Sequence, residues 1–362
     1  MIDFKALFRQ AIEAKASDIH LQGGHAPILR VHGGLVRAGK DAVGAEELKQ
    51  QIAQMLPPHM KGDFREEAAK GLDFSFTDAV AGRFRCSAFN TLGAPGMTMR
   101  SIRTNIPSIQ DLYLPTAVMD IALAQRGLTL VTGTTGSGKS TTLAAMIDLI
   151  NTNYDVKIIT VEDPIEYMHS EKRALVSQIE VGSDSASFDQ ALRQALRQDP
   201  DVILIGELRD IETLRMALRA ADTGHQVFAT VHSARAAQTI ERIIAMFPSA
   251  EHKVLLSQLA QSLEAIISQR LVPTRDGNGR RPAIEILRGG PVTEKYVLEG
   301  KLAELTEYVQ SGESGMQSFD QHLLQMVNDR IITGKEALKN ASRPEALATA
   351  MRGIRYVGKS NV

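Results

Sequence analysis

The arrangement of apolar and polar positions divides this chain into two parts that meet near residue 116. In the first part, a stripe of apolar residues at helical spacing predicts an amphipathic helix; its members are Phe4, Leu7, Phe8, Ala11 and Ile12. The pair Gly33-Gly34 separates two short apolar runs and predicts a β-hairpin. Further elements are predicted as helices over residues 45–56 and 59–70 and as strands over residues 72–76, 83–89 and 97–102. Together these elements predict a small α+β domain over residues 1–103.

Residues 104–115 are predicted to form a linker, because Pro107 and Pro115 bracket them and proline fits poorly inside helices and sheets. Leu112 and Leu114 indicate that this linker packs against a folded part of the chain. From residue 116 onward, strands and helices alternate. The strands are predicted over residues 128–132, 156–161, 202–205, 227–231 and 265–269, and the helices over residues 139–150, 187–197, 211–222 and 253–263. Such alternation predicts a doubly wound α/β sheet with its ligand beyond the carboxyl ends of the strands.

The α/β core is expected to occupy residues 116–290, with a further short strand over residues 281–286. After Gly289-Gly290-Pro291 the pattern becomes mostly helical, so residues 291–362 are expected to form a helical region. One apolar stripe stands out there; it consists of Phe319, Leu323, Met326 and Val327.

Composition narrows the class of function. The chain has 362 residues, of which 43% are hydrophobic and 23% are charged, and its net charge is −1. This is an ordinary globular composition, and it gives no support to a strongly basic surface for nucleic acid. No apolar run approaches the ~20 residues that span a bilayer, and the start of the chain does not have the pattern of a signal peptide, so a cytoplasmic location is expected. The single cysteine, Cys86, excludes an intrachain disulfide and a thiolate zinc site, and we expect a buried thiol.

The strongest chemical signal is a full match to the P-loop pattern G-x-x-x-x-G-K-[ST]. Its residues are Gly133, Thr134, Thr135, Gly136, Ser137, Gly138, Lys139 and Ser140. The glycines let backbone N–H groups turn toward phosphate oxygens, the lysine brings a positive charge, and the serine hydroxyl binds Mg²⁺. The motif lies between a predicted strand and a predicted helix, which is the context that it requires. We therefore predict a site for ATP with Mg²⁺, to which Thr141 also contributes.

Acidic residues follow two of the predicted strands. Glu207 ends the apolar run that starts at Asp201, where a P-loop enzyme needs a carboxylate to hold Mg²⁺ through water or to orient the attacking water. Glu162, Asp163 and Glu166 follow the strand over residues 156–161 and are expected near the same phosphate end. Such clustered carboxylates repel each other unless a cation or proton offsets them, and Mg²⁺ is the expected cation. The alternatives are a surface acid after a buried strand for Glu207 and a solvated acidic loop for the other three.

Two histidines and four arginines complete the candidate site. His225 and His232 flank the strand over residues 227–231, which fits a phosphate sensor or an intersubunit contact, with a purely structural role as the alternative. The spacing and the lack of thiolates exclude a metal site at these histidines. The arginines lie near the end of the first part and are Arg83, Arg85, Arg100 and Arg103. In a monomer they are ordinary surface charges, whereas in a ring they could reach a neighbour's nucleotide as arginine fingers.

Four segments, in this order, resemble the boxes of one family. The P-loop over residues 133–140 is the Walker A box, residues 160–167 the Asp box, residues 201–210 the Walker B box and residues 224–233 the His box. The phrase Ser17-Asp18-Ile19-His20-Leu21 is also typical of that group. The chain resembles the secretion ATPases of the type IV pilus and type II/IV secretion class, and within them the PilT/PilU-type pilus retraction ATPases, over nearly its whole length.

The resemblance implies an N-terminal PAS-like domain and a C-terminal RecA-like domain that pack across subunits of a homohexamer, with ATP between them. It implies that Glu207 is the catalytic glutamate that positions or activates water. It implies further that Glu162, Asp163 and Glu166 support Mg²⁺ and water.

By the same resemblance, His225 and His232 lie near the γ-phosphate, and Arg85 and Arg100 approach the nucleotide. The function implied is a Mg²⁺-dependent motor that acts through a membrane platform protein to drive pilin disassembly. The chain is then expected at the cytoplasmic face of the inner membrane.

Two departures from the family pattern bear on this function. The polymerising branch carries a tetracysteine zinc module, which one cysteine excludes. PilT-type ATPases carry an Ala-Ile-Arg-Asn-Leu-Ile phrase near the C-terminus, and residues 291–298 do not match it, while residues 271–281 and 315–321 are closer to PilU. An accessory module that binds nucleotide and supports a paralogous retraction ATPase is therefore a second hypothesis. A hexameric nucleic-acid motor is a third, which the near-neutral charge disfavours.

Overall fold

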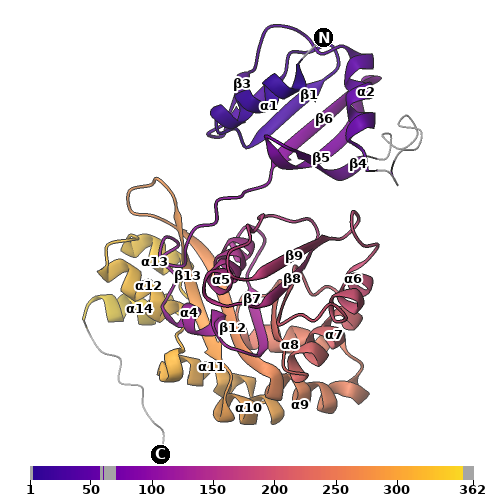
Figure 1. Ribbon diagram of the computed structural model, residues 1–362. Coiled ribbons are helices and arrows are strands. Elements are labelled where there is room, and N and C mark those ends of the chain that lie inside the picture. Colours follow the sequence, from indigo (N-terminus) through magenta and orange to yellow (C-terminus); the bar gives the residue numbers. More distant parts are fainter. Residues whose placement is uncertain (1–2, 58–59, 61–70, 354–362) are drawn as a thin grey trace, which may run out of the picture. The chain divides into compact units, whose positions relative to one another are not determined.

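The computed structural model describes residues 3–57, 60 and 71–353, and these fold as two compact units (Figure 1). The first unit comprises Met1–Thr104 with two short later segments, Pro164–Met168 and Glu180–Ala186. The second unit comprises Asn105–Asp163, His169–Ile179 and Ser187–Val362. Apart from Met60, the helix predicted over residues 59–70 lies outside the described residues.

The first unit is built on a six-stranded antiparallel sheet in the order β3-β2-β1-β6-β5-β4. Its strands are β1 (Asp18–Gln22), β2 (Ile28–Val31), β3 (Gly34–Arg37), β4 (Leu72–Asp78), β5 (Gly82–Thr91) and β6 (Ala94–Ser101), and its helices are α1 (Phe4–Glu13) and α2 (Ala45–Met55). The predicted hairpin is confirmed as β2–β3. His32 and Gly33 both have positive φ (+49° and +83°), as a tight two-residue hairpin turn requires.

Helices α1 and α2 share one apolar core with the sheet. The stripe predicted on α1 is confirmed, since Phe4, Leu7, Phe8 and Ala11 are buried in this core, whereas Ile12 is 46% exposed. Cys86 belongs to the same core, and burial raises the pKa of its thiol to about 12. The expected buried thiol is therefore confirmed.

The second unit contains a seven-stranded sheet in the order β13-β12-β7-β11-β10-β8-β9. Its strands are β7 (Gly127–Thr132), β8 (Lys157–Glu162), β9 (Leu175–Glu180), β10 (Val202–Ile205), β11 (Gln226–Val231), β12 (Leu263–Pro273) and β13 (Arg280–Arg288). The five strands from β12 to β8 run parallel, and β13 pairs antiparallel with β12. The predicted parallel α/β sheet is thus confirmed, and the carboxyl ends of β7, β8, β10 and β11 meet at one edge.

Helices accompany these strands in the alternation that the sequence predicts (Figure 1). They are α4 (Ala117–Ala122), α5 (Lys139–Asn153), α6 (Phe188–Ala195), α7 (Ile211–Asp222), α8 (Ala236–Met246), α9 (His252–Ser262) and α10 (Pro291–Leu298). The C-terminal helices are α11 (Leu302–Ser311), α12 (Phe319–Asn328), α13 (Gly334–Asn340) and α14 (Pro344–Met351). The apolar stripe on α12 is confirmed, because Phe319, Leu323 and Met326 are buried against β12 and β13. Among the described residues, we find no helix of the length and apolarity that a bilayer crossing needs.

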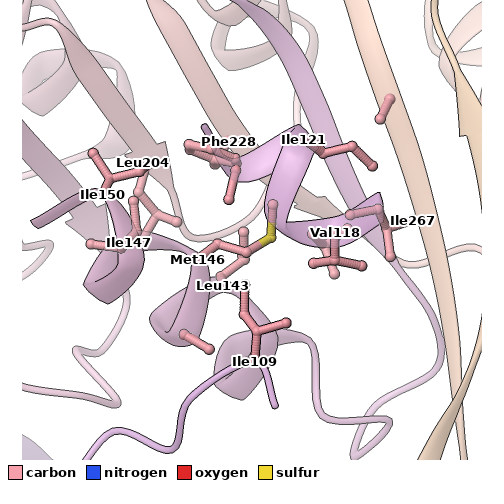
Figure 2. Packing of buried hydrophobic residues seen from close by; sticks show 14 of the residues in the cluster. Ile109, Val118, Ile121, Leu143, Met146, Ile147, Ile150, Leu204, Phe228 and Ile267 are labelled. Carbon is pink, nitrogen blue, oxygen red and sulfur yellow. The ribbon is translucent and has the colours of Figure 1, made fainter. Parts of the chain in front are cut away.

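The core beside α5 also holds the segment predicted as a linker (Figure 2). Ile109 is 3% exposed and Leu114 is 8% exposed, and both join the cluster that Leu143 and Met146 contribute from α5. Burial of an aliphatic side chain of this size contributes about 1.5–3 kcal/mol. The packing inferred from Leu112 and Leu114 is confirmed, and this segment belongs to the second unit.

Candidate functional site

A glycine-rich loop joins β7 to α5, and the backbone conformation of this loop requires glycine at three positions. Gly133 has φ +149° and Gly138 has φ +93°, which disfavour any side chain. A Cβ atom at Gly133 would lie 2.4 Å from Ser137 Oγ and 2.5 Å from the Gln269 carbonyl oxygen. At Gly138 it would lie 2.7 Å from Gln269 Nε2. Gly133 and Gly138 are thus required by both their φ values and the atoms packed against them, and Gly136 by its φ of +76° alone.

Gln269 supports this loop from β12, a role that the sequence analysis missed. Its Nε2 donates to the Ser137 carbonyl oxygen at 2.6 Å, and its Oε1 accepts from Thr142 Oγ1 at 2.9 Å. Gln269 is only 2% exposed. The sequence did contain a signal for this role, because Gln269 lies within an apolar strand and a buried amide group needs hydrogen-bond partners.

Lys139 begins α5, and its ammonium group turns back onto the loop. Nζ donates to the carbonyl oxygens of Gly133 (3.0 Å) and Thr134 (3.2 Å) and lies 3.5 Å from His232 Nδ1. The hydroxyl of Ser137 is buried and, among the described residues, is without a hydrogen-bond partner. An ammonium group, an orphaned hydroxyl and a helix N-terminus at one loop form a site for an anion of phosphate type.

The remaining residues of the motif lie around the same loop. Thr134, Thr135 and Gly136 are exposed, while Ser140 and Thr141 are half-buried in the first turn of α5. The residues present therefore fit the polyphosphate of a nucleotide, with Ser140 available to a metal ion.

Glu207 lies beyond the end of β10, within reach of this loop through His232. Its Oε1 is 3.0 Å from His232 Nε2, and its Oε2 accepts from Arg209 Nε at 2.7 Å. Arg209 Nη1 is 3.6 Å from Asp163 Oδ2, at the end of β8. Lys139, His232, Glu207 and Asp163 are thus brought together at one edge of the sheet, as the sequence predicts.

Arg209 was missed by the sequence analysis. Mg²⁺ is the cation expected to offset Glu162, Asp163 and Glu166. In this structure the Arg209 guanidinium group contacts one of them, Asp163, together with Glu207. The available signal was an arginine two residues after the acid that ends the strand.

The other acids of the Asp box are placed differently from one another. Glu162 Oε1 accepts from Thr160 Oγ1 at 2.7 Å and from Gln178 Nε2 at 3.4 Å. Glu166 is exposed and belongs to the Pro164–Met168 segment of the first unit, whereas Glu162 and Asp163 belong to the second. The predicted group of three acids is therefore divided between the two units.

The placement of His225 corrects the role expected for it near the γ-phosphate. His225 precedes β11, and the register pairs Gln226 with Gly127 at the start of β7. It lies at the far end of the strand from His232, about 20 Å away along the backbone. Its Nδ1 is 2.9 Å from the Ala220 carbonyl oxygen. Within one chain, His225 does not join the site, because a six-residue strand separates it from the phosphate loop.

Arg85 and Arg100 are register partners on β5 and β6, so both side chains leave the same face of the first sheet. Arg100 Nε donates to Asp18 Oδ1 at 2.8 Å, yet Arg100 remains 68% exposed. Burial alone would raise the pKa of Asp18, but its hydrogen bonds from Arg100 and Ser17 hold that pKa below its usual value. Both arginines therefore present charge at this face.

Arg83 and Arg103 have partners inside the first unit. Arg83 Nη2 lies 3.3 Å from Glu180 Oε2, and Arg103 Nη1 donates to the Tyr167 hydroxyl at 3.0 Å. Their contacts are with the two short segments that the first unit takes from later in the chain.

Comparison with known proteins agrees with this geometry. The family model described as Type II/IV secretion system protein matches residues 1–322. A twitching motility protein of Neisseria gonorrhoeae is 42% identical over 323 residues, covering 89% of this chain and 86% of that protein. The type IV pilus ATPase PilU of Pseudomonas aeruginosa is 40% identical, covering 94% of this chain and 89% of that protein.

Among solved structures, the pilus retraction motor PilT with bound ADP superimposes with a TM-score of 0.85 at 38% identity. The match covers 95% of this chain and 98% of that one. Since the family model and these relatives extend over most of the chain, the chain belongs to the type II/IV secretion system protein family.

Proposed function

We propose that this chain is an ATP-hydrolysing motor that powers type IV pilus retraction. The observation that carries the proposal is the chain of contacts from the phosphate-loop Lys139 through His232 to Glu207. It connects the group that would bind the outer phosphates with the carboxylate that would act on the attacking water. The proposal draws its biological context from relatives of 40–42% identity, named for twitching motility and for a type IV pilus ATPase.

The proposal gives separate roles to a few residues of the second unit. Lys139 and the backbone N–H groups of the loop bind and orient the phosphates, where a positive charge stabilises the charge that develops in phosphoryl transfer. Ser140 holds Mg²⁺, which supplies charge neutralisation when bound. Glu207 accepts a hydrogen bond from the attacking water, and His232 holds the Glu207 carboxylate.

Mg²⁺ has few protein ligands in this proposal. Among the residues that the structure describes, no three His, Cys, Asp or Glu side chains are grouped so as to hold a metal ion. Mg²⁺ is commonly held by one or two protein groups together with water and substrate phosphates. Ser140 suits such a site, and Asp163 and Glu162 would support it through water.

The working assembly that we propose is a homohexamer with a PAS-like first unit and a RecA-like second unit. The exposed face that carries Arg85 and Arg100 supports a role for these arginines toward a nucleotide. The proposed partner is a platform protein of the inner membrane, at whose cytoplasmic face the ring would act.

A second candidate is an accessory ATPase that supports a paralogous retraction motor. It is favoured by residues 291–298, which form α10 without the phrase typical of PilT. Nucleotide that stays bound in stoichiometric amounts with negligible turnover would favour this candidate.

The test is steady-state phosphate release by the purified full-length chain with MgATP, over a range of protein concentrations. We expect turnover per subunit to rise with concentration and to be lost in Glu207→Gln, while nucleotide affinity is retained. Glu304→Gln, an exposed acid on α11, serves as the matched control. Collapse of ATP affinity in Glu207→Gln would contradict the role given to Glu207.

A further inference from the structure

We infer that Arg209 is a positioning residue for hydrolysis, which holds the Glu207 carboxylate in one orientation and separates it from Asp163. The inference rests on the proposed function and adds to it a residue that lies outside the phosphate loop. It concerns side chains of the second unit only.

Both oxygens of the Glu207 carboxylate are engaged. Oε2 accepts from Arg209 Nε at 2.7 Å, and Oε1 lies 3.0 Å from His232 Nε2. A free glutamate side chain samples several rotamers, and fixing it in one costs conformational entropy. Partners on both oxygens supply that restraint before any substrate binds, which is the requirement for a preorganised carboxylate.

The loop that carries Arg209 is anchored on both sides. Thr230 Oγ1 donates to the Gly206 carbonyl oxygen at 2.6 Å, and the Leu208 N–H donates to the Thr230 carbonyl oxygen at 3.0 Å. Asp210 caps α7 by accepting from the Thr213 N–H at 2.8 Å. The Arg209 side chain is 57% exposed, so its contacts with the acids, rather than packing, set its position.

Arg209 also lies between charges that would otherwise repel. Its Nη1 is 3.6 Å from Asp163 Oδ2, and Asp163 directly follows β8, the neighbour of the strand β10 that Glu207 follows. Arg209 contacts both carboxylates, so its loss removes the cation between them, and repulsion between like charges turns a mobile carboxylate away. The phosphate loop is held by Gln269 instead, so loss of Arg209 should leave nucleotide binding intact.

The experiment compares phosphate release by the full chain and by Arg209→Gln and Arg209→Lys. We expect kcat to fall about 10- to 100-fold in Arg209→Gln, since small misplacement of a reacting group has effects of that size, with KM for MgATP within about threefold. Arg209→Lys should recover part of kcat, because an ammonium group keeps a positive charge between the acids. Arg173→Gln is the matched control; Arg173 is exposed and donates from Nε to Asp155 at 3.1 Å before β8, and kcat there should stay within about twofold.

Unchanged or increased kcat in Arg209→Gln overturns the inference. Equal losses in the glutamine and lysine variants, with KM raised, would show general damage and also overturn it. If the unmodified chain shows no turnover, the proposed function fails and the Arg209 role fails with it. If turnover is lost in Glu207→Gln but kept in Arg209→Gln, only the role of Arg209 fails.

Discussion

The carboxyl ends and the amino ends of the second sheet belong to the same strands, yet their polar side chains have different partners. At the carboxyl ends, ionisable groups contact one another, as in the contacts of His232 and Arg209 with Glu207. At the amino ends, Asp201 and His225 contact backbone groups instead. Asp201 accepts from the Lys157 N–H at 2.7 Å, and His225 contacts the Ala220 carbonyl oxygen. The comparison teaches that the partners of a side chain, rather than its type, distinguish a reactive edge from a structural one.

The test with the largest expected effect on turnover compares one lysine at the carboxyl ends of the strands with one at the amino ends. Lys139→Ala removes the charge that would face the phosphates, and we expect turnover to fall at least about 10³-fold, with weaker ATP binding. Lys157→Ala removes a lysine from the amino end, where Nζ donates to Ser177 Oγ at 2.8 Å, and should keep turnover within about threefold. Phosphate release and nucleotide affinity decide the outcome, and near-normal turnover by Lys139→Ala would contradict the ATPase assignment.

His232 provides the next largest effect. His232→Gln keeps a polar side chain but loses the simultaneous contact with Lys139 and Glu207. We expect kcat to fall about 10- to 100-fold, in the range seen when one preorganised hydrogen-bonding group is lost. Single-turnover measurements with saturating ATP would separate this loss from weaker binding. Full activity would mean that the contact seen here has no part in hydrolysis.

A structural histidine should instead affect stability as a function of pH. Nδ1 of His322 accepts from the Ile284 N–H at 2.9 Å, and burial lowers the pKa of His322 to about 4. The unfolded chain, with a histidine pKa near 6.5, then binds more protons, so stability is present above about pH 6.5 and is lost as the pH falls toward 4. Between pH 7.5 and pH 5 the loss should be about 2 kcal/mol.

This expectation is checked by urea unfolding of the full chain and of His322→Gln at both pH values. Glutamine can accept the same backbone hydrogen bond without titrating. The variant should therefore lose less stability on acidification than the unmodified chain. Equal losses in both would rule out His322 as the source.

His225 should give the smallest effect on activity. His225→Ala removes the contact with the Ala220 carbonyl oxygen, and we expect about 1 kcal/mol of lost stability, with turnover within about threefold. Thermal unfolding and phosphate release measure the two quantities. A large loss of turnover would show that His225 acts through another subunit and would weaken the contrast between the two ends.

Local patterns in the sequence were sufficient to predict much of this site. Alternating strands and helices predicted a parallel sheet, and a parallel sheet brings Asp163, Glu207 and His232 to the edge that carries the P-loop. The spacing could not show that Gln269 reaches Ser137, because 132 residues separate them and the contact depends on strand order. Arg209 had no pattern of its own. The predicted parallel sheet already implies that His225 lies at the opposite end of β11 from His232, so the role expected for His225 near the γ-phosphate rested on the family resemblance alone.

In the fold, β1, β9, α4 and α8 were not predicted. α8 was missed although it buries Ala236, Ile240 and Ile243 at helical spacing, whereas β9 and α4 have weak patterns. β9 is exposed at Leu175 and half-buried at Val176–Ile179, so its sequence shows no clear alternation of apolar and polar residues. α4 has only six residues, too few for a helical stripe to be recognised. The long strand β12 extends on both sides of the five residues predicted for it, because Leu263 pairs with β7 and the pairing with β13 continues to Pro273.

The neighbour of Gln269 has a consequence for mechanics. Arg270 stacks on the Phe319 ring at 4.0 Å and donates to the Asn340 carbonyl oxygen at 2.7 Å, so it holds α12 and α13. Adjacent residues of one strand point to opposite faces, so Gln269 faces the phosphate loop while Arg270 faces the C-terminal helices. A single peptide bond therefore joins the residue that contacts the phosphate loop to the residue that contacts the C-terminal helices. A load on α12 or α13 would thus have a path to the phosphate loop that runs through two adjacent residues of one strand.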